Sequence, residues 1–252
     1  MDTIALITGA NKGIGYATAK LLAAQGVRVL VGARDAGRGH AAAEELGERA
    51  RFVPLDVTDA DSIATAAKLI QTEYGQLDIL VNNAGIARLE GDPEVDGYGL
   101  PSKASVDTLR ETYETNVFGV VAVTNAMLPL LRRAAAARIV NVSSGVGSFA
   151  SMTDPDSPLW VLSALSYPSS KSALNMITAQ YAKELRDTPI KINAANPGYC
   201  ATDLNGHSGP RTAEQGAQVV VELANLPADG PSGILWGQDD TMTEPQHIRM
   251  PW

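Results

Sequence analysis

The fold is decided by the stretch Ile4-Ala5-Leu6-Ile7-Thr8-Gly9-Ala10-Asn11-Lys12-Gly13-Ile14-Gly15. Its first five residues form the short apolar run that is typical of a buried strand. Three glycines follow with the spacing Gly-x-x-x-Gly-x-Gly, and small and apolar residues recur at helical spacing from Gly15 to Gln25. We predict a strand, a tight turn and a helix, whose backbone N–H groups can approach a pyrophosphate closely. A glycine-rich turn that binds nothing is the alternative.

Strand and helix signals alternate along the rest of the chain. Apolar runs predict further strands at 27–33, 51–55, 77–82, 138–143 and 191–195. Helical spacing predicts helices at 41–46, 62–74, 106–133 and 167–187. This alternation indicates an α/β fold with a single doubly wound, Rossmann-like parallel sheet and helices on both faces. No linker or repeat divides the chain, so we expect one domain over residues 1–252.

Three predicted loops are the expected walls of a substrate site. Ligands of such sheets bind beyond the carboxyl ends of the strands. The segments 86–105, 145–166 and 199–215 follow strands and are rich in Gly, Pro, Asp or Ser. The tryptophans either shape an apolar wall there or pack in the core or at an interface; they are Trp160, Trp236 and Trp252.

Charge and composition exclude several kinds of partner. The net charge of -8 and the scattered Lys and Arg residues argue against nucleic acid or an anionic membrane. The first residues carry no basic leader, and no uninterrupted apolar stretch is expected to cross a bilayer, so a cytoplasmic protein is predicted. Cys200 is the only cysteine, which excludes an internal disulfide. The three histidines are isolated in the sequence, and we expect no metal site.

The most informative chemical signal is the pair Tyr167 and Lys171. A spacing of four residues puts both side chains on one face of a helix. An ammonium beside a phenol favours the phenolate and is expected to lower the pKa of Tyr167 toward the working range. Such a pair suits reversible proton transfer to a carbonyl oxygen, although the same spacing also occurs on ordinary solvated helices.

Further motifs accompany this pair. In order, the chain carries Thr8 to Gly15, Asp56-Val57, Asn82-Asn83-Ala84-Gly85, Asn116, Asn141-Val142-Ser143-Ser144, Tyr167-Pro168-Ser169-Ser170-Lys171, and Pro197-Gly198 with Thr202. With this set the sequence resembles the short-chain dehydrogenase/reductase family over almost its whole length. The glycine spacing noted above is the one this family uses. The resemblance implies a nicotinamide dinucleotide cofactor and hydride transfer at a carbonyl carbon.

The resemblance assigns catalytic roles to four residues: Asn116, Ser144, Tyr167 and Lys171. Tyr167 would donate a proton to the carbonyl oxygen, and Ser144 would hydrogen-bond the same oxygen. Lys171 would hold the ribose hydroxyls and lower the pKa of the phenol. Asn116 would keep a water in line with Lys171 and complete a proton relay. Ser143 competes with Ser144, but the family's active serine is the second of this pair.

The resemblance also implies a set of cofactor-binding residues. They are Gly9, Asn11, Lys12, Gly13, Ile14, Gly15, Arg34, Asp56, Val57, Asn83, Ala84, Gly85, Tyr167, Lys171, Pro197, Gly198 and Thr202. Asp56 and Val57 would contact adenine, and residues 83–85 would pass close to the adenosine ribose. Thr202 would hydrogen-bond the nicotinamide end. A helix cap is the alternative role for Asp56.

Charge after the second predicted strand favours NADP(H) over NAD(H). An NAD site needs a carboxylate for the ribose 2′-hydroxyl, whereas an NADP site needs cations for the 2′-phosphate. By resemblance the carboxylate position falls on Ala33, and Arg34 follows it directly. Lys12 could reach the same phosphate, and Arg38 is a weaker third candidate. Asp35 is the rival, since its carboxylate could accept from a hydroxyl.

One branch of the family fits best. The long segment 145–166, Asn11-Lys12 and Ala33-Arg34 make the chain most similar to the carbonyl reductases, which reduce aldehydes, ketones and quinones with NADPH. Several members of that branch are monomers. We therefore predict an NADPH-dependent carbonyl reductase that acts on a small-molecule carbonyl as a monomer, with a dimer left open. The alternatives are a ketoreductase with one dedicated biosynthetic substrate and a dinucleotide-sensing regulator without turnover.

Overall fold

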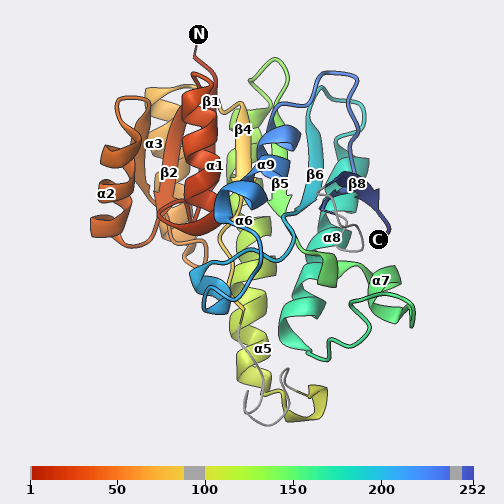
Figure 1. Ribbon diagram of the computed structural model, residues 1–252. Coiled ribbons are helices and arrows are strands. Elements are labelled where there is room, and N and C mark those ends of the chain that lie inside the picture. The colour runs from red at the N-terminus through yellow and green to blue at the C-terminus, as the bar shows by residue number, and fades with distance from the viewer. Residues whose placement is uncertain (1, 88–99, 239–245) are drawn as a thin grey trace.

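A computed structural model describes residues 2–87, 100–238 and 246–252, so part of the predicted loop 86–105 lies outside the described residues. The described part contains one eight-stranded sheet in the order β3-β2-β1-β4-β5-β6-β7-β8 (Figure 1). The strands are β1 (Ile4–Thr8), β2 (Arg28–Ala33), β3 (Ala50–Pro54), β4 (Ile79–Asn82), β5 (Arg138–Val142), β6 (Lys191–Asn196), β7 (Leu235–Gln238) and β8 (His247–Met250). Neighbouring strands are parallel from β3 to β7, and only β8 is antiparallel.

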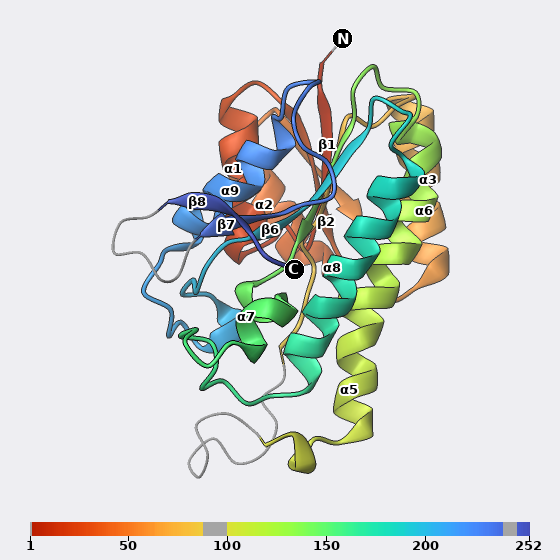
Figure 2. The ribbon, with the colours of Figure 1, turned by 90° about the vertical axis from the view of Figure 1, so that its right-hand side faces the viewer.

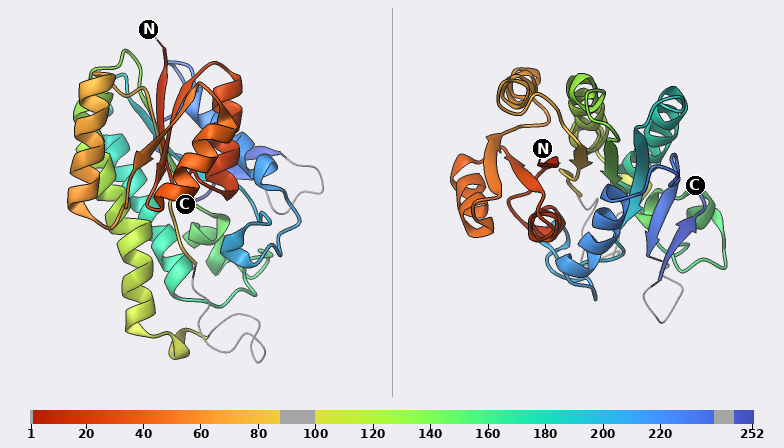
Figure 3. Two further views of the ribbon diagram at one scale, coloured as in Figure 1. Left: turned by 90° about the vertical axis from the view of Figure 1, so that its left-hand side faces the viewer. Right: turned by 90° about the horizontal axis from the view of Figure 1, so that it is seen from above.

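Helices cover both faces of this sheet. They are α1 (Gly13–Ala24), α2 (Ala36–Leu46), α3 (Ala60–Glu73), α5 (Val106–Tyr113), α6 (Gly119–Leu131), α7 (Phe149–Thr153), α8 (Ser166–Glu184) and α9 (Ala213–Ala224). Short helical turns are η1 (Pro101–Lys103), η2 (Glu114–Phe118), η3 (Gly145–Gly147) and η4 (Asp203–Asn205). Seen from above in Figure 3, α3, α6 and α8 lie on one face and α1 and α9 on the other. The predicted doubly wound α/β fold is confirmed.

The core has two parts because side chains on a strand alternate between the faces of a sheet. In β1, Ala5 and Ile7 join the cluster under α1 and α9, whereas Ile4 and Leu6 join the cluster under α3 and α6. Burial on both faces explains why the central strands are continuous apolar runs that can be recognised in the sequence.

The C-terminal part differs from the sequence prediction. The sequence predicts a loop over 199–215, but this segment contains η4 and the first turn of α9. No element was predicted for β7 or β8, and β8 pairs antiparallel with β7. These strands have four residues each, and their sequences, Leu-Trp-Gly-Gln and His-Ile-Arg-Met, lack the continuous apolar runs of the central strands.

The predicted helix 106–133 is interrupted in its middle. The five residues Glu114–Phe118 form a π-helical stretch between α5 and α6. By length and composition alone, Val106–Leu131 could cross a membrane, although charged and amide residues interrupt its apolar sequence. Half of its most apolar window is buried inside the fold, where α6 packs on α3 and β4, as a core helix does.

Candidate active site

The glycine-rich turn between β1 and α1 leaves the backbone accessible. Gly9 and Gly13 adopt positive φ angles of 65° and 58°, which side chains disfavour. A Cβ on Gly15 would lie 2.4 Å from Asn83 Nδ2 and 2.8 Å from the Gly9 carbonyl oxygen, so this position has no room for a side chain. The turn ends at the N-terminus of α1, where backbone N–H groups favour an anion.

Thr8 ties this turn to the end of β4. Its hydroxyl oxygen accepts hydrogen bonds from the N–H groups of Asn83 at 3.0 Å and Ala84 at 2.9 Å. The Asn83 side chain donates to the Thr8 carbonyl at 2.8 Å. Two predicted cofactor-binding segments are thus held together. The sequence analysis did not identify this linking role of Thr8, although Thr8 directly precedes the first glycine.

The structure separates the roles of Arg34 and Asp35 at the end of β2. Asp35 is the N-cap of α2; its two oxygens accept from the backbone N–H of Arg38 at 2.9 Å and its guanidinium at 3.1 Å. These bonds hold the pKa of Asp35 below its ordinary value. Arg34 is exposed, and no hydrogen bond of its side chain is recorded among the described residues. Asp35, the rival for a ribose hydroxyl, is therefore already engaged.

Asp56 lies close to Arg34 without acting as a helix cap. Its Oδ1 accepts from the backbone N–H and the hydroxyl of Thr58, while Asp59 is the N-cap of α3. Burial raises the pKa of Asp56, but the Thr58 hydrogen bonds and the charge of Arg34 outweigh it and leave the pKa below its ordinary value. Val57, the other predicted adenine contact, packs against Gly119.

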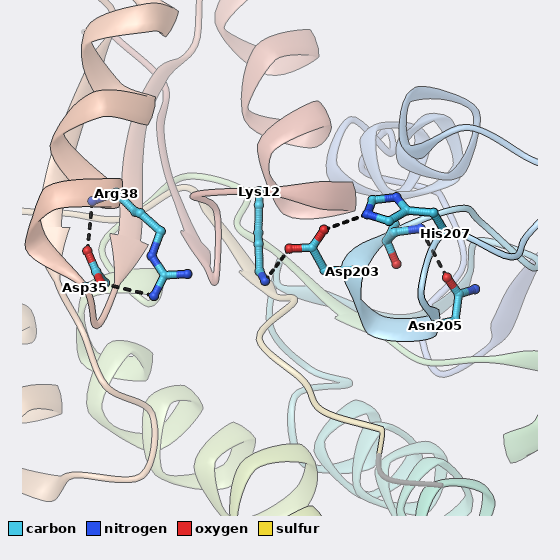
Figure 4. Close-up of polar contacts among 7 residues, drawn as sticks. Lys12, Asp35, Arg38, Asp203, Asn205 and His207 are labelled. Carbon is cyan, nitrogen blue, oxygen red and sulfur yellow. Dashed lines mark hydrogen bonds and ion pairs between the residues drawn. The ribbon is translucent and has the colours of Figure 1, made fainter. Parts of the chain in front are cut away.

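Lys12 forms an ion pair that the sequence does not reveal. Its ammonium lies 2.6 Å from Asp203 Oδ2, and Asp203 Oδ1 lies 2.9 Å from His207 Nε2 (Figure 4). Lys12 and, to a smaller extent, His207 hold the pKa of Asp203 below its ordinary value. The glycine turn is therefore joined to the segment that follows β6.

Tyr167 and Lys171 lie on α8, one turn apart, beside α5 (Figure 2). Lys171 Nζ is 5.5 Å from the centre of the Tyr167 ring and donates to the Val142 carbonyl at 2.8 Å. Burial raises the pKa of Tyr167 to about 12, although a hydrogen bond with Ser144 opposes this, and burial lowers the pKa of Lys171 to about 8. The predicted lowering of the phenol pKa is therefore wrong: removal from water dominates, and the ammonium is directed to a carbonyl.

Asn116 lies in the π-helical stretch and is almost completely buried. Its amide donates to the Ile86 carbonyl at 2.9 Å and to the Ser170 hydroxyl at 3.0 Å, and its oxygen accepts from the Ile86 N–H at 2.9 Å. Ser170 in turn donates to the Tyr167 carbonyl at 2.7 Å. Both amide donors of Asn116 are used, so a water near it has to donate to an oxygen. π-helical stretches occur often at functional sites.

The two serines after β5 have different surroundings. Ser143 is buried and donates to Asn175 Oδ1 at 2.6 Å, whereas Ser144 is partly exposed and hydrogen-bonds Tyr167. A Cβ on Gly85 would lie 3.3 Å from Asn116 Oδ1 and 3.8 Å from Lys171 Nζ, so the segment after β4 lies close to both residues. This arrangement supports the choice of Ser144, which stays a prediction.

The segment after β6 closes the other side of the site. Asn196 Oδ1 accepts from the N–H groups of Gly145 at 2.9 Å and Gly198 at 3.1 Å, and so positions both loops. The Thr202 methyl group lies 3.6 Å from the place of a Cβ on Gly13. Asn196 was missed in the sequence, although an amide directly before Pro197-Gly198 is a signal that could have identified it.

Other predicted wall residues are not part of this group. The Trp236 indole donates to Glu222 on α9, and the Trp252 carbonyl accepts from Ala150 at the start of α7. Cys200 is buried, and its thiol donates to the Pro197 carbonyl. Within the described ranges no group of three or more His, Cys, Asp or Glu residues could hold a metal ion; the absence of a metal site stays a prediction.

The residues present fit a nicotinamide dinucleotide. The glycines of the turn leave backbone N–H groups accessible at the start of α1, where a pyrophosphate can bind. Lys171 has three N–H donors, and among the described residues only the Val142 carbonyl is recorded as an acceptor. The fold and this site define the class: an α/β protein with a dinucleotide turn and a Ser–Tyr–Lys group at the carboxyl edge of one sheet.

The comparisons with known proteins place the chain within that class. The family described as short chain dehydrogenase matches residues 3–213, and the chain belongs to this family of oxidoreductases. The short-chain dehydrogenase anuI of Penicillium roqueforti is 40% identical over 257 residues, which cover 95% of each chain.

Two solved structures resemble it over most of their length. Salutaridine reductase of Papaver somniferum has a TM-score of 0.78 and 32% identity, covering 92% of this chain and 99% of its own. The NADPH-bound carbonyl reductase from chicken fatty liver has a TM-score of 0.79 and 30% identity, covering 93% and 96%. The predicted resemblance to the carbonyl reductase branch is confirmed.

Proposed function

We propose that this protein is an NADPH-dependent carbonyl reductase that reduces aldehydes, ketones or quinones. The observation that carries the proposal is the arrangement of Ser144, Tyr167 and Lys171: two hydroxyls in hydrogen-bond contact, with a buried ammonium beside the ring. Two hydroxyls held together can both hydrogen-bond one carbonyl oxygen, and the family is one of oxidoreductases.

Tyr167 is the proposed general acid. Because its pKa is raised to about 12, the phenol is protonated at neutral pH and able to donate. A reduced nicotinamide, when bound, supplies the hydride. As negative charge develops on the carbonyl oxygen, that oxygen becomes more basic than a phenolate, and the proton moves from Tyr167. Ser144 donates a hydrogen bond to the same oxygen and stabilises its charge.

Lys171 is proposed to serve the phenolate that remains. With a pKa of about 8, its ammonium is largely protonated at neutral pH. Its charge near the ring favours the phenolate, and its remaining N–H donors suit ribose hydroxyls. Asn116 holds Ser170, which donates to the carbonyl of Tyr167, so the start of α8 is fixed. Any water of the proposed relay would donate to an oxygen of Asn116.

The preference for NADPH is proposed from Arg34. Its exposed guanidinium follows β2, while the neighbouring carboxylate of Asp35 is bound to Arg38. The solved relative from chicken is an NADPH-bound carbonyl reductase, which supports the same choice. Lys12 is the second cation proposed for the 2′-phosphate.

An apolar substrate is proposed from the long segment 145–166. It carries Phe149, Trp160 and Val161, whose side chains are exposed, and α7 lies beside α8 in Figure 2. A second candidate function is a reductase with one dedicated substrate, which the similarity to salutaridine reductase favours.

The test is a panel of aldehydes, ketones and quinones, measured with NADPH and NADH in parallel by consumption of the reduced nicotinamide. We expect turnover of several unrelated carbonyls with NADPH. Turnover of one compound alone would favour the dedicated reductase. Binding of NADPH without turnover of any carbonyl would contradict the proposal and favour a dinucleotide sensor.

We further propose that residues 1–252 act as one domain, because the first and last strands belong to the same sheet. The monomeric state and the cytoplasmic location predicted from the sequence stay predictions.

A further inference from the structure

The ion pair between Lys12 and Asp203 joins two segments that are 191 residues apart in the sequence. Its 2.6 Å distance is short, although both side chains are about half exposed, at 53% and 54%. The Thr202 methyl group lies 3.6 Å from the place of a Cβ on Gly13, so the two backbones are adjacent beside the pair. Figure 4 shows Lys12 pointing toward Asp203. The contact therefore follows from the packing of the two segments.

A strained residue supports this carboxylate. His207 has a φ of 61° and is the only non-glycine residue with a positive φ in the part of the chain that the structure describes. This conformation is unfavourable for a residue with a side chain. It follows Gly206 and lets the His207 N–H donate to the Thr202 carbonyl at 2.9 Å. The imidazole then lies against Oδ1 of Asp203, and Oδ2 is left for Lys12.

Each of the three cations around the proposed phosphate site has a carboxylate near it. The pairs are Arg34 with Asp56, Arg38 with Asp35, and Lys12 with Asp203. In the first two pairs the carboxylate follows β2 or β3, the neighbouring strands at one end of the sheet. Asp203 differs because it comes from the segment after β6. A dianion that approaches Lys12 thus meets a negative charge that already neutralises this cation.

We propose that Asp203 is a specificity-determining residue, which holds Lys12 and so limits the preference of the site for a 2′-phosphate over a 2′-hydroxyl. This inference rests on the proposed function, which places the 2′-phosphate near Arg34 and Lys12. The phosphate must either draw Lys12 away from Asp203 or accept a carboxylate as its neighbour. A 2′-hydroxyl carries no charge, so it neither has to displace Lys12 nor is repelled by the carboxylate of Asp203.

The test is the binding of NADP+ and NAD+ to the Asp203→Asn variant, measured by isothermal titration calorimetry. This substitution keeps the shape of the side chain and removes its charge. We expect NADP+ to bind about two- to fivefold more tightly, the range of an exposed ion pair, and NAD+ to bind unchanged. In a Lys12→Met background the same substitution should no longer improve NADP+ binding.

Asp229→Asn is the matched control, because Asp229 is exposed and distant in sequence from both segments. It should leave the ratio of the two affinities unchanged. Unaltered or weaker NADP+ binding in Asp203→Asn, or equal tightening for both dinucleotides, would overturn the inference. Persistence of the gain without Lys12 would overturn it as well.

The parent protein separates this inference from the proposed function. If it binds NADP+ and Asp203→Asn has no effect, only the role of Asp203 is lost. If the parent binds NAD+ alone, the proposed NADPH dependence fails. In that case the role of Asp203 holds only if Asp203→Asn creates NADP+ binding.

Discussion

Two regions of the molecule differ in burial and in the interactions that hold their side chains. The proposed catalytic region comprises Asn116, Ser144, Tyr167 and Lys171. In it, Asn116 and Lys171 are at most 5% exposed and make directed hydrogen bonds to backbone and side chains. The proposed phosphate region comprises Lys12, Arg34 and Arg38. Its side chains are exposed, and Lys12 and Arg38 form ion pairs at the surface.

The contrast teaches which property of the site is fixed and which can change. When a buried polar group loses its hydrogen-bond partner, the protein is destabilised by the full desolvation free energy of that group. We therefore expect the catalytic region to tolerate few substitutions. Exposed ion pairs are weak in water and exchange partners readily. We expect the position of the reacting groups to be rigid, while the choice of dinucleotide responds to single charges.

The largest expected effect is in the catalytic region. Tyr167→Phe should lower kcat by roughly 10²-fold or more, because the proton donor is lost, and should leave NADPH affinity nearly intact. Steady-state kinetics and calorimetry check both. Tyr181→Phe is the control on the same helix, where the hydroxyl donates to Asn125. Unchanged kcat in Tyr167→Phe would remove Tyr167 from the role of acid.

The next effect concerns the phosphate region. Arg34→Ala should weaken NADPH binding by about ten- to a hundredfold and spare NADH, because a charge-assisted contact worth about 1.5–3 kcal/mol is lost. Dissociation constants for both dinucleotides test this. Arg186→Ala removes another exposed arginine, which is paired with Asp187, and should change neither. Equal weakening of NADPH and NADH would show that Arg34 does not recognise the phosphate.

A third effect links burial in the catalytic region to pH. The pKa of Lys171 is about 8 in the folded protein and 10.5 ordinarily, so between these values the unfolded chain binds a proton that the native state has lost. The free energy of unfolding should therefore rise with pH, by about 2 kcal/mol from pH 8 to 10, relative to Lys171→Met. Urea unfolding of both proteins over this range measures it.

Tyr167 provides an internal check of that sign. Its raised pKa means that above pH 10 the unfolded chain loses the phenol proton first, so stability should fall there. Parallel stability curves for the parent and Lys171→Met between pH 8 and 10 would contradict the proposed burial of the ammonium.

The smallest expected effect is on the free energy of unfolding, and it compares one substitution in each region. Lys12→Met should change the free energy of unfolding by less than about 0.5 kcal/mol, since the ion pair is exposed. Asn116→Ala should cost about 1–3 kcal/mol, because the backbone groups of Ile86 lose their partner. Urea unfolding of the two variants side by side is the measurement. Equal losses would mean that the two regions do not differ as proposed.

The sequence predicts the central elements well because burial imposes a pattern. Strands β1 to β6 appear as apolar runs within one or two residues of their observed ends. The sequence does not predict helix α9, because Val219-Val220-Val221 are β-branched and indicate a strand as readily as a helix. Its capping box, Thr212 with Gln215, was the available signal.

The site is predictable where spacing along one helix determines contact. Tyr167 and Lys171 share a face of α8 because they are four residues apart. That spacing does not reveal burial, which is why the direction of the phenol pKa was wrong. Nor does it reveal partners from distant segments, such as Asp203 for Lys12 or Asn196 for the backbone of Gly145. Such contacts follow from how the strands are ordered in the sheet.

The π-helical stretch Glu114–Phe118 has a consequence for the whole of Val106–Leu131. One extra residue in a turn rotates everything beyond it by about 100° relative to a regular α-helix. α5 can therefore present one side to α8 while α6 presents a different side to α3. Deleting a single residue between 114 and 118 should restore an ordinary helix and yet turn Asn116 away from Ile86. This local irregularity therefore sets how α6 is rotated about its axis relative to α5.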